Sequence, residues 1–177
     1  MTKVDEFYMQ RCLQLAKKGI NDVKSNPMVG CVITIPKRES SMEQKIIAEG
    51  YHKAYGKAHA EVEAINKIQD KSILKRATLY VNLEPCAHFG KTPPCADLVS
   101  SIQFHRVVVG MRDPNPLVSG RGVQRLEKAG IHVDVNVLET ECEDVNRKFC
   151  INQLKNRPYI LLNWPKGEKG ARRVRQR

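Results

Sequence analysis

Short, nearly continuous apolar runs alternate along this chain with segments of helical periodicity, and this alternation restricts the fold most. The apolar runs occupy residues 28–35, 45–51, 77–83, 107–111 and 131–137. Helical spacing predicts helices over residues 5–18, 59–68, 122–129 and 139–154, and a further one beginning near Pro94. Runs without a polar face predict strands buried on both sides. The class is therefore α/β, with a central sheet between two layers of helices.

The composition is that of a globular, basic protein. Its 177 residues suit one domain or slightly more, and 30 basic against 19 acidic residues give a net charge of +11. Six basic residues and one acidic residue lie within 166–177, so the tail carries +5 of that charge. No run approaches the ~20 apolar residues of a membrane helix, and the N-terminus lacks the apolar core of a secretion signal. We therefore expect a cytoplasmic protein without membrane contact.

Three potential metal ligands either follow a strand or lie at the start of a helix. His59 and Glu61 form an H-x-E motif at the predicted start of a helix, Cys86 follows a strand, and Cys95 opens the next helix. Each alone has a structural explanation, because buried cysteines are common core residues. Together His59, Cys86 and Cys95 match a three-ligand zinc site with an open fourth position. Helix N-termini favour the thiolate form that binds a metal.

Two interpretations of this zinc site remain open at this point. A structural site would need a fourth protein ligand, for which His88 is the candidate. A catalytic site gives Glu61 a task, since a carboxylate beside the metal can take a proton from the zinc-activated water and deliver it to a substrate. The remaining cysteines, Cys12, Cys31, Cys142 and Cys150, are expected to be core residues.

The segment Glu84 to Cys95 resembles a specific family. Eight residues separate its two cysteines, where the general zinc deaminase signature has two. This string resembles the deaminase domain of the bifunctional riboflavin biosynthesis deaminase/reductase, a member of the cytidine deaminase-like superfamily. The likeness covers residues 5–162 and includes further motifs in the same order. These are residues 26–30, Gly50 with His52, residues 59–62, and residues 111–116 with Gly120 and Gly122 beyond them.

The resemblance implies a three-layer α-β-α cytidine deaminase-like fold, with a mixed sheet of about five strands. It implies zinc held by His59, Cys86 and Cys95, with Glu61 as the proton shuttle. It places seven residues in the substrate pocket: Asn26, His52, His88, Lys91, Thr92, Asp113 and Asn115. For Asn26 and for the pair Asp113 and Asn115 the alternative is turn chemistry, in which these residues only set the backbone. Lys91 is suited to a substrate phosphate.

The activity implied is hydrolytic deamination of diaminohydroxyphosphoribosylaminopyrimidine to the corresponding uracil in riboflavin biosynthesis. The expected partner is this small phosphorylated pyrimidine, with no nucleic acid, and the family implies a homo-oligomer. One alternative is a nucleotide- or tRNA-directed zinc deaminase, to which the basic charge could point. The other is a non-enzymatic zinc-stabilised binding module, which would leave Glu61 without a function.

The domain prediction is a deaminase domain over residues 1–150 and a linker with a truncated reductase start over 151–177. Residues 157–162 resemble the opening strand of the reductase, and the basic stretch that follows lacks apolar periodicity. We therefore expect neither reductase activity nor nicotinamide binding, and a disordered basic tail.

Overall fold

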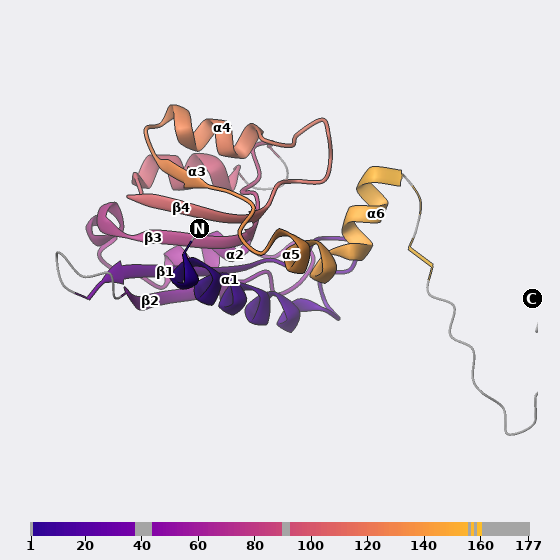
Figure 1. Ribbon diagram of the computed structural model, residues 1–177, viewed down its shortest axis with the longest axis horizontal. Helices are drawn as coiled ribbons and strands as arrows, with labels where there is room; N and C mark the ends of the chain where they lie inside the picture. Colours follow the sequence, from indigo (N-terminus) through magenta and orange to yellow (C-terminus); the bar gives the residue numbers. More distant parts are fainter. Residues whose placement is uncertain (1, 38–43, 90–92, 156, 158, 161–177) are drawn as a thin grey trace, which may run out of the picture.

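A mixed five-stranded sheet forms the centre of the computed structural model (Figure 1). Its strands are β1 (Gly30–Pro36), β2 (Gln44–Tyr51), β3 (Thr78–Leu83), β4 (Arg106–Met111) and β5 (His132–Asp134). They lie in the order β2-β1-β3-β4-β5, with β1 antiparallel to both of its neighbours and β3, β4 and β5 parallel. The structure describes residues 2–37, 44–89, 93–155, 157 and 159–160.

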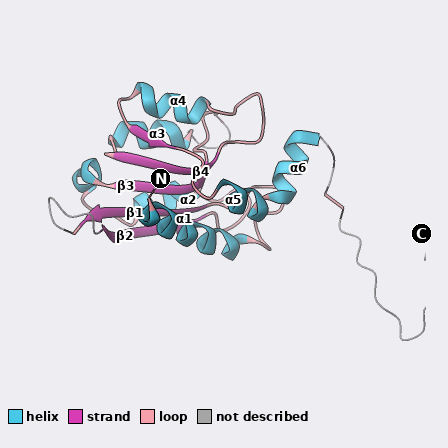
Figure 2. Cartoon of the chain, in the orientation of Figure 1, coloured by secondary structure: helices cyan, strands magenta, loops and turns pink. Residues whose placement is uncertain are grey.

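Helices cover both faces of this sheet (Figure 2). They are α1 (Lys3–Ala16), α2 (Ala60–Asn66), α3 (Cys95–Ile102), α4 (Arg121–Lys128), α5 (Glu139–Val145) and α6 (Arg147–Lys155), with 3-10 turns at Lys17–Gly19 and Lys71–Arg76. One core cluster joins the sheet to α2, α3 and α4, and a second joins its other face to α1 and α5. The predicted three-layer architecture is confirmed. Within the described residues, no helix is both long and apolar enough to cross a membrane.

Side-chain alternation along the central strands explains why the apolar runs are continuous. Leu79 and Val107 belong to the core cluster under α2 and α3, whereas their chain neighbours Tyr80 and Val108 belong to the cluster under α1. All four side chains are fully buried. Because successive residues of a strand face opposite sides, a sheet covered on both faces needs apolar residues at nearly every position.

The helix predicted over residues 139–154 is instead two helices that meet at Asn146. This residue is buried and has φ −101° and ψ 17°, outside the helical range. Its side-chain amide accepts a hydrogen bond from the N–H of Met28 (2.8 Å) and donates one to the Met28 carbonyl oxygen (3.0 Å). The chain therefore turns between α5 and α6 where this contact with the segment before β1 forms.

The strand predicted over residues 131–137 is shorter than expected. β5 spans only His132–Asp134, and Asn136 and Leu138 have left-handed φ values of 65° and 55°. Left-handed residues cannot continue a strand. The turn they form leads directly into α5.

The predicted domain boundary at residue 150 falls within α6, and the division into two parts stays a prediction. Tyr159 and Ile160, from the proposed reductase strand, are described and lie in no strand. The rest of that run and the basic tail lie outside the described residues.

A buried carboxylate fixes the start of α1 to the sheet. Asp5 is 1% exposed and forms a capping box with Thr2, and it also accepts two hydrogen bonds from Arg106 at 2.7 and 3.2 Å. Arg106 in turn pairs with Asp134 in β5. Burial by itself raises the pKa of Asp5, but the hydrogen bonds from Arg106 and Thr2 outweigh it and lower this pKa to about 2.

We therefore predict that Asp5→Asn lowers the free energy of unfolding at pH 7 by on the order of 2 kcal/mol. Because the pKa of Asp5 is lower in the folded protein than its ordinary 3.8, its contribution is complete above that value. The contribution falls as the pH drops through 3.8 towards 2. Urea unfolding at pH 7 and at pH 3 should show the gap between parent and variant narrowing in acid.

The control is Asp134→Asn, which removes the half-exposed partner of the same arginine and should cost less than about 1 kcal/mol. An equal gap between the parent and Asp5→Asn at both pH values would contradict the prediction.

Candidate active site

Chain segments that are distant in sequence meet at one edge of the sheet. β3 and β4 are parallel, so the residues that follow them, Glu84 to Cys86 and Asp113 to Asn115, emerge on the same side. β1 runs antiparallel to β3 and therefore begins at this edge, with Gly30 opposite Tyr51, the last residue of β2. The segments before β1 and after β2 consequently enter the same region, which places Asn26 and His52 there.

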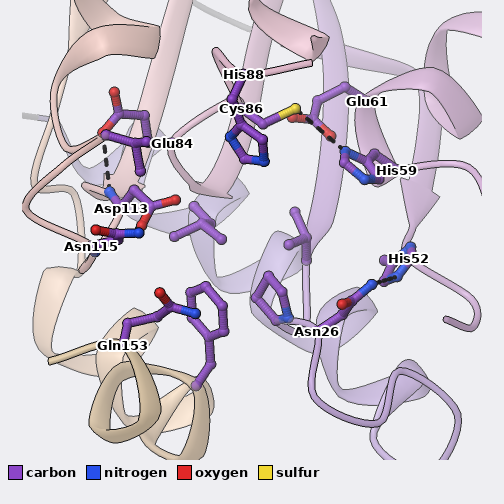
Figure 3. Close-up of a pocket in the computed structure, with 15 residues that line it drawn as sticks. Asn26, His52, His59, Glu61, Glu84, Cys86, His88, Asp113, Asn115 and Gln153 are labelled. Atoms are coloured by element: carbon purple, nitrogen blue, oxygen red, sulfur yellow. Dashed lines mark hydrogen bonds between the residues drawn. The ribbon is translucent and has the colours of Figure 1, made fainter. Parts of the chain in front are cut away.

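A cavity of about 390 Å³ lies at this edge (Figure 3). Its volume is in the range of small-molecule sites. Five of the seven predicted substrate-contact residues line it, namely Asn26, His52, His88, Asp113 and Asn115, together with His59, Glu61 and Cys86. The other two, Lys91 and Thr92, lie outside the described residues.

The three predicted zinc ligands come together beside the cavity. His59 is the N-cap residue of α2, Cys86 follows β3, and Cys95 is the first residue of α3. The Nδ1 atom of His59 lies 3.2 Å from Sγ of Cys95 and 3.7 Å from Sγ of Cys86, and the Cys95 backbone N–H donates to Sγ of Cys86 at 3.3 Å. The potential ligand atoms all lie within 4.8 Å of one another, so the group could hold a metal ion.

The protonation of the two thiols fits a soft divalent cation. A hydrogen bond from Cys95 outweighs the effect of burial and, with another from His59, lowers the pKa of Cys86. The same contact with Cys86, together with burial, raises the pKa of Cys95. One thiolate therefore forms readily, and a cation between the sulfurs would supply the charge that stabilises the second. Two thiolates and an imidazole are a donor set that suits zinc.

His88 does not join this donor group. In the part of the chain that the structure describes, the potential ligands within 4.8 Å of one another are His59, Cys86 and Cys95 alone. The His88 side chain is exposed and lines the cavity. The arrangement thus favours the three-ligand interpretation with an open position over the closed structural site.

Glu61 is the second residue of α2 and faces the donor group (Figure 3). Its side chain is 3% exposed, and burial raises the pKa of its carboxyl to about 7. A carboxyl group with a pKa near neutrality can both accept and donate a proton at physiological pH. Glu61 thus has the position and proton affinity of a general acid and base.

A paired amide and imidazole form another wall of the cavity. The carbonyl oxygen of Ala58 lies 3.1 Å from Nδ1 of His52, so Nδ1 must be the protonated nitrogen. Nε2 then accepts a hydrogen bond from the amide of Asn26 at 3.2 Å. Burial lowers the pKa of His52, which keeps the ring neutral. The Asn26 side chain is thereby held in one orientation beside the cavity.

Asp113 and Asn115 form a turn and also line the cavity. Asp113 accepts a hydrogen bond from the backbone N–H of Asn115 (2.8 Å), and the Asn115 side chain accepts one from the N–H of Leu117 (3.0 Å). These are the turn contacts that the alternative interpretation requires. Both residues also line the cavity, so the turn presents them to it.

Three polar or aromatic residues of this cavity were not predicted from the sequence. Phe149 and Gln153 line it from α6, four residues apart and therefore on one helix face. Glu84 lines it from the end of β3 and is buried. Only Glu84 carried a usable signal, because it directly follows a strand whose carboxyl end faces the site.

Comparison with known proteins identifies similar sequences over most of the chain. A family model described as the cytidine and deoxycytidylate deaminase zinc-binding region matches residues 2–111. The riboflavin biosynthesis protein RibD of Aquifex aeolicus is 47% identical over 162 residues, 92% of this chain and 43% of that protein. The diaminohydroxyphosphoribosylaminopyrimidine deaminase of Buchnera aphidicola is 43% identical over 145 residues, 82% of this chain and 92% of that protein. The chain thus spans less than half of the RibD relative and nearly all of the Buchnera one.

Solved structures agree with these sequence matches. RibD of Acinetobacter baumannii superposes with a TM-score of 0.79 at 42% identity, over 88% of this chain and 41% of that one. A deaminase/reductase of Thermotoga maritima gives a TM-score of 0.77 at 43% identity, over 88% of this chain and 42% of that one. The similarity in both cases covers less than half of the larger protein.

We predict that Cys86→Ser and His59→Ala lower the zinc content of the purified protein from about one equivalent to less than about a tenth. Loss of one of three donors removes most of the affinity, because the remaining two cannot enclose the ion. Elemental analysis after dialysis measures the content.

The matched control is Cys150→Ser, which changes a half-buried cysteine of α6 outside the donor group and should keep its zinc. Full zinc occupancy in Cys86→Ser would show that the metal is held elsewhere.

Proposed function

The chain belongs to the cytidine and deoxycytidylate deaminase family, and we propose that it hydrolytically deaminates diaminohydroxyphosphoribosylaminopyrimidine. The observation that carries the proposal is the buried carboxylate of Glu61 beside a His/Cys/Cys donor group at the wall of a cavity. The match to the Buchnera aphidicola protein covers 92% of that protein, which is named for this deaminase activity. The resemblance to the riboflavin biosynthesis deaminase is confirmed.

His59, Cys86 and Cys95 would hold the zinc ion through one nitrogen and two sulfurs. When bound, zinc supplies Lewis acidity, which lowers the pKa of a water molecule towards ~7 and makes it nucleophilic. His59 and Cys86 also line the cavity, so the donor group adjoins the space that a substrate would occupy.

Glu61 would move the protons of the reaction. Its carboxylate takes a proton from the attacking water as the new C–O bond forms at the pyrimidine carbon that carries the amine. It passes that proton to the adjacent ring nitrogen, then takes the proton of the newly added hydroxyl and transfers it to the amine. The amine leaves as ammonia when the C–N bond breaks and the C=O bond forms. The raised pKa of this buried carboxyl suits both directions of transfer, since a group that titrates near neutrality can accept a proton and give it up.

The remaining cavity residues would bind and orient the substrate. The fixed amide of Asn26, with His52 behind it, is placed to contact the pyrimidine ring. Asp113, Asn115 and His88 offer polar groups on other walls for the ring and the ribose. Lys91 and Thr92 are proposed for the phosphate on the resemblance alone. Self-association and a cytoplasmic location stay predictions.

We predict that Glu61→Gln lowers the rate of ammonia release by roughly 10³-fold while leaving the zinc content unchanged. The amide keeps the size of the side chain but cannot accept the proton from water. A coupled ammonia assay and elemental analysis on the same preparation measure both properties.

Glu63→Gln is the matched control, because Glu63 lies on the same helix and pairs with Lys53 at the surface. It should retain the parent rate. A Glu61→Gln protein with parent activity would contradict the assigned role, and zinc without ammonia release in the parent would favour a non-enzymatic module.

The substrate class is tested by offering the parent protein the diaminopyrimidine phosphate, cytidine and a single-stranded RNA at equal concentrations. We expect ammonia from the first only, with kcat/KM at least about 100-fold higher than for cytidine, because the cavity has polar groups on several walls. Preferential turnover of cytidine or RNA would overturn the proposed substrate and support the nucleotide-directed alternative.

A further inference from the structure

The side chain of Glu84 accepts four hydrogen bonds from backbone N–H groups. Its Oε2 atom accepts from Asp113 (3.0 Å) and Gly120 (2.9 Å), and its Oε1 atom accepts from Gly122 (2.8 Å) and Val123 (3.1 Å). The residue is 5% exposed. A carboxylate offers about four acceptor positions, so these donors occupy its whole capacity. Glu84 is therefore suited neither to proton transfer nor to metal binding, although it lies beside the site.

These four donors belong to both ends of one loop. Asp113 starts the loop that follows β4, and Gly122 and Val123 lie in the first turn of α4. The first N–H groups of a helix have no partner within the helix, and the N-cap residue Gly120 has no side chain with which to bind them. Glu84 supplies the missing acceptor from another strand, and thus determines where the loop begins and where it ends.

The loop held in this way carries cavity residues. Asp113, Asn115 and Val118 all line the cavity, and the Asp113 carboxylate in turn accepts from the N–H of Asn115. Glu84 is two residues from Cys86 in the chain, and Gly122 packs so closely on Pro85 that an added methyl group would overlap the Pro85 carbonyl oxygen. One carboxylate therefore joins the loop to the segment that bears a proposed zinc ligand (Figure 3).

We propose that Glu84 is a positioning residue for catalysis, which sets the distance between the loop of Asp113 and Asn115 and the donor group around Cys86. The inference rests on the proposed function. A substrate that bridges the cavity must contact the loop of Asp113 and Asn115 and the donor group around Cys86 at the same time. If this loop could shift, substrate binding would weaken, whereas proton transfer by Glu61 would be affected less.

The test is Glu84→Gln. Glutamine has the same shape, but one of its two terminal groups is an NH₂ donor, which would face two N–H groups instead of accepting from them. We expect KM for the diaminopyrimidine phosphate to rise at least tenfold, kcat to change less than about threefold and zinc to stay bound. Hydrogen exchange of the peptide spanning 112–124 should become faster.

The matched control is Asp5→Asn, another nearly fully buried carboxylate with several hydrogen bonds, which lies at the opposite edge of the sheet beside the start of β4. It should lower stability without changing KM, which separates positioning from a general loss of stability. An unchanged KM in folded Glu84→Gln, or loss of its zinc, would overturn the proposal.

Glu84→Asp keeps the charge and is the second variant if Glu84→Gln does not fold. Its shorter side chain cannot reach both pairs of donors, so we expect an intermediate rise in KM, and no rise would contradict the proposal. The exchange measurement needs no substrate. If the parent lacks deaminase activity, the proposed function fails, whereas unchanged exchange in the 112–124 peptide would show that the anchoring fails.

Discussion

The direction of three neighbouring strands is the constraint on which the site depends. β3 and β4 run in parallel and end at the same edge, while β1 runs against them and begins there. Strand order therefore collects residues from the first and middle thirds of the chain at one place. The chemistry needs few residues, but their meeting requires several strands, since no single segment holds His59 together with Cys86 and Cys95.

Local pattern was sufficient to predict the layers of the fold and to single out the three potential metal donors. Both faces of β3 and β4 are covered, and this burial appears in the sequence as nearly continuous apolar runs, to which the fully buried Tyr80 and Val108 belong. His59, Cys86 and Cys95 were recognisable because each lies at the start of a helix or the end of a strand, and these positions can be inferred from spacing. The structure brings their ligand atoms together.

Long-range partners account for what local pattern could not provide. The break at Asn146 is invisible to periodicity, because its cause is a pair of hydrogen bonds to Met28, which is 118 residues away. Phe149 and Gln153, which line the cavity, lie on the helix that begins after that break. The strand around 131–137 was overestimated for a different reason, since apolar residues there pack on the core from a left-handed turn and not from an extended strand.

The amide contact between Asn146 and Met28 also bears on when the protein can become competent during its synthesis. The segment before β1 leaves the ribosome early, yet its partner is made 118 residues later. Contacts of such sequence separation form late, because a long loop must close first. The nascent chain can thus assemble the sheet and the three metal donors while one side of the cavity is still open. The cavity wall that Phe149 and Gln153 contribute is completed only when α6 emerges.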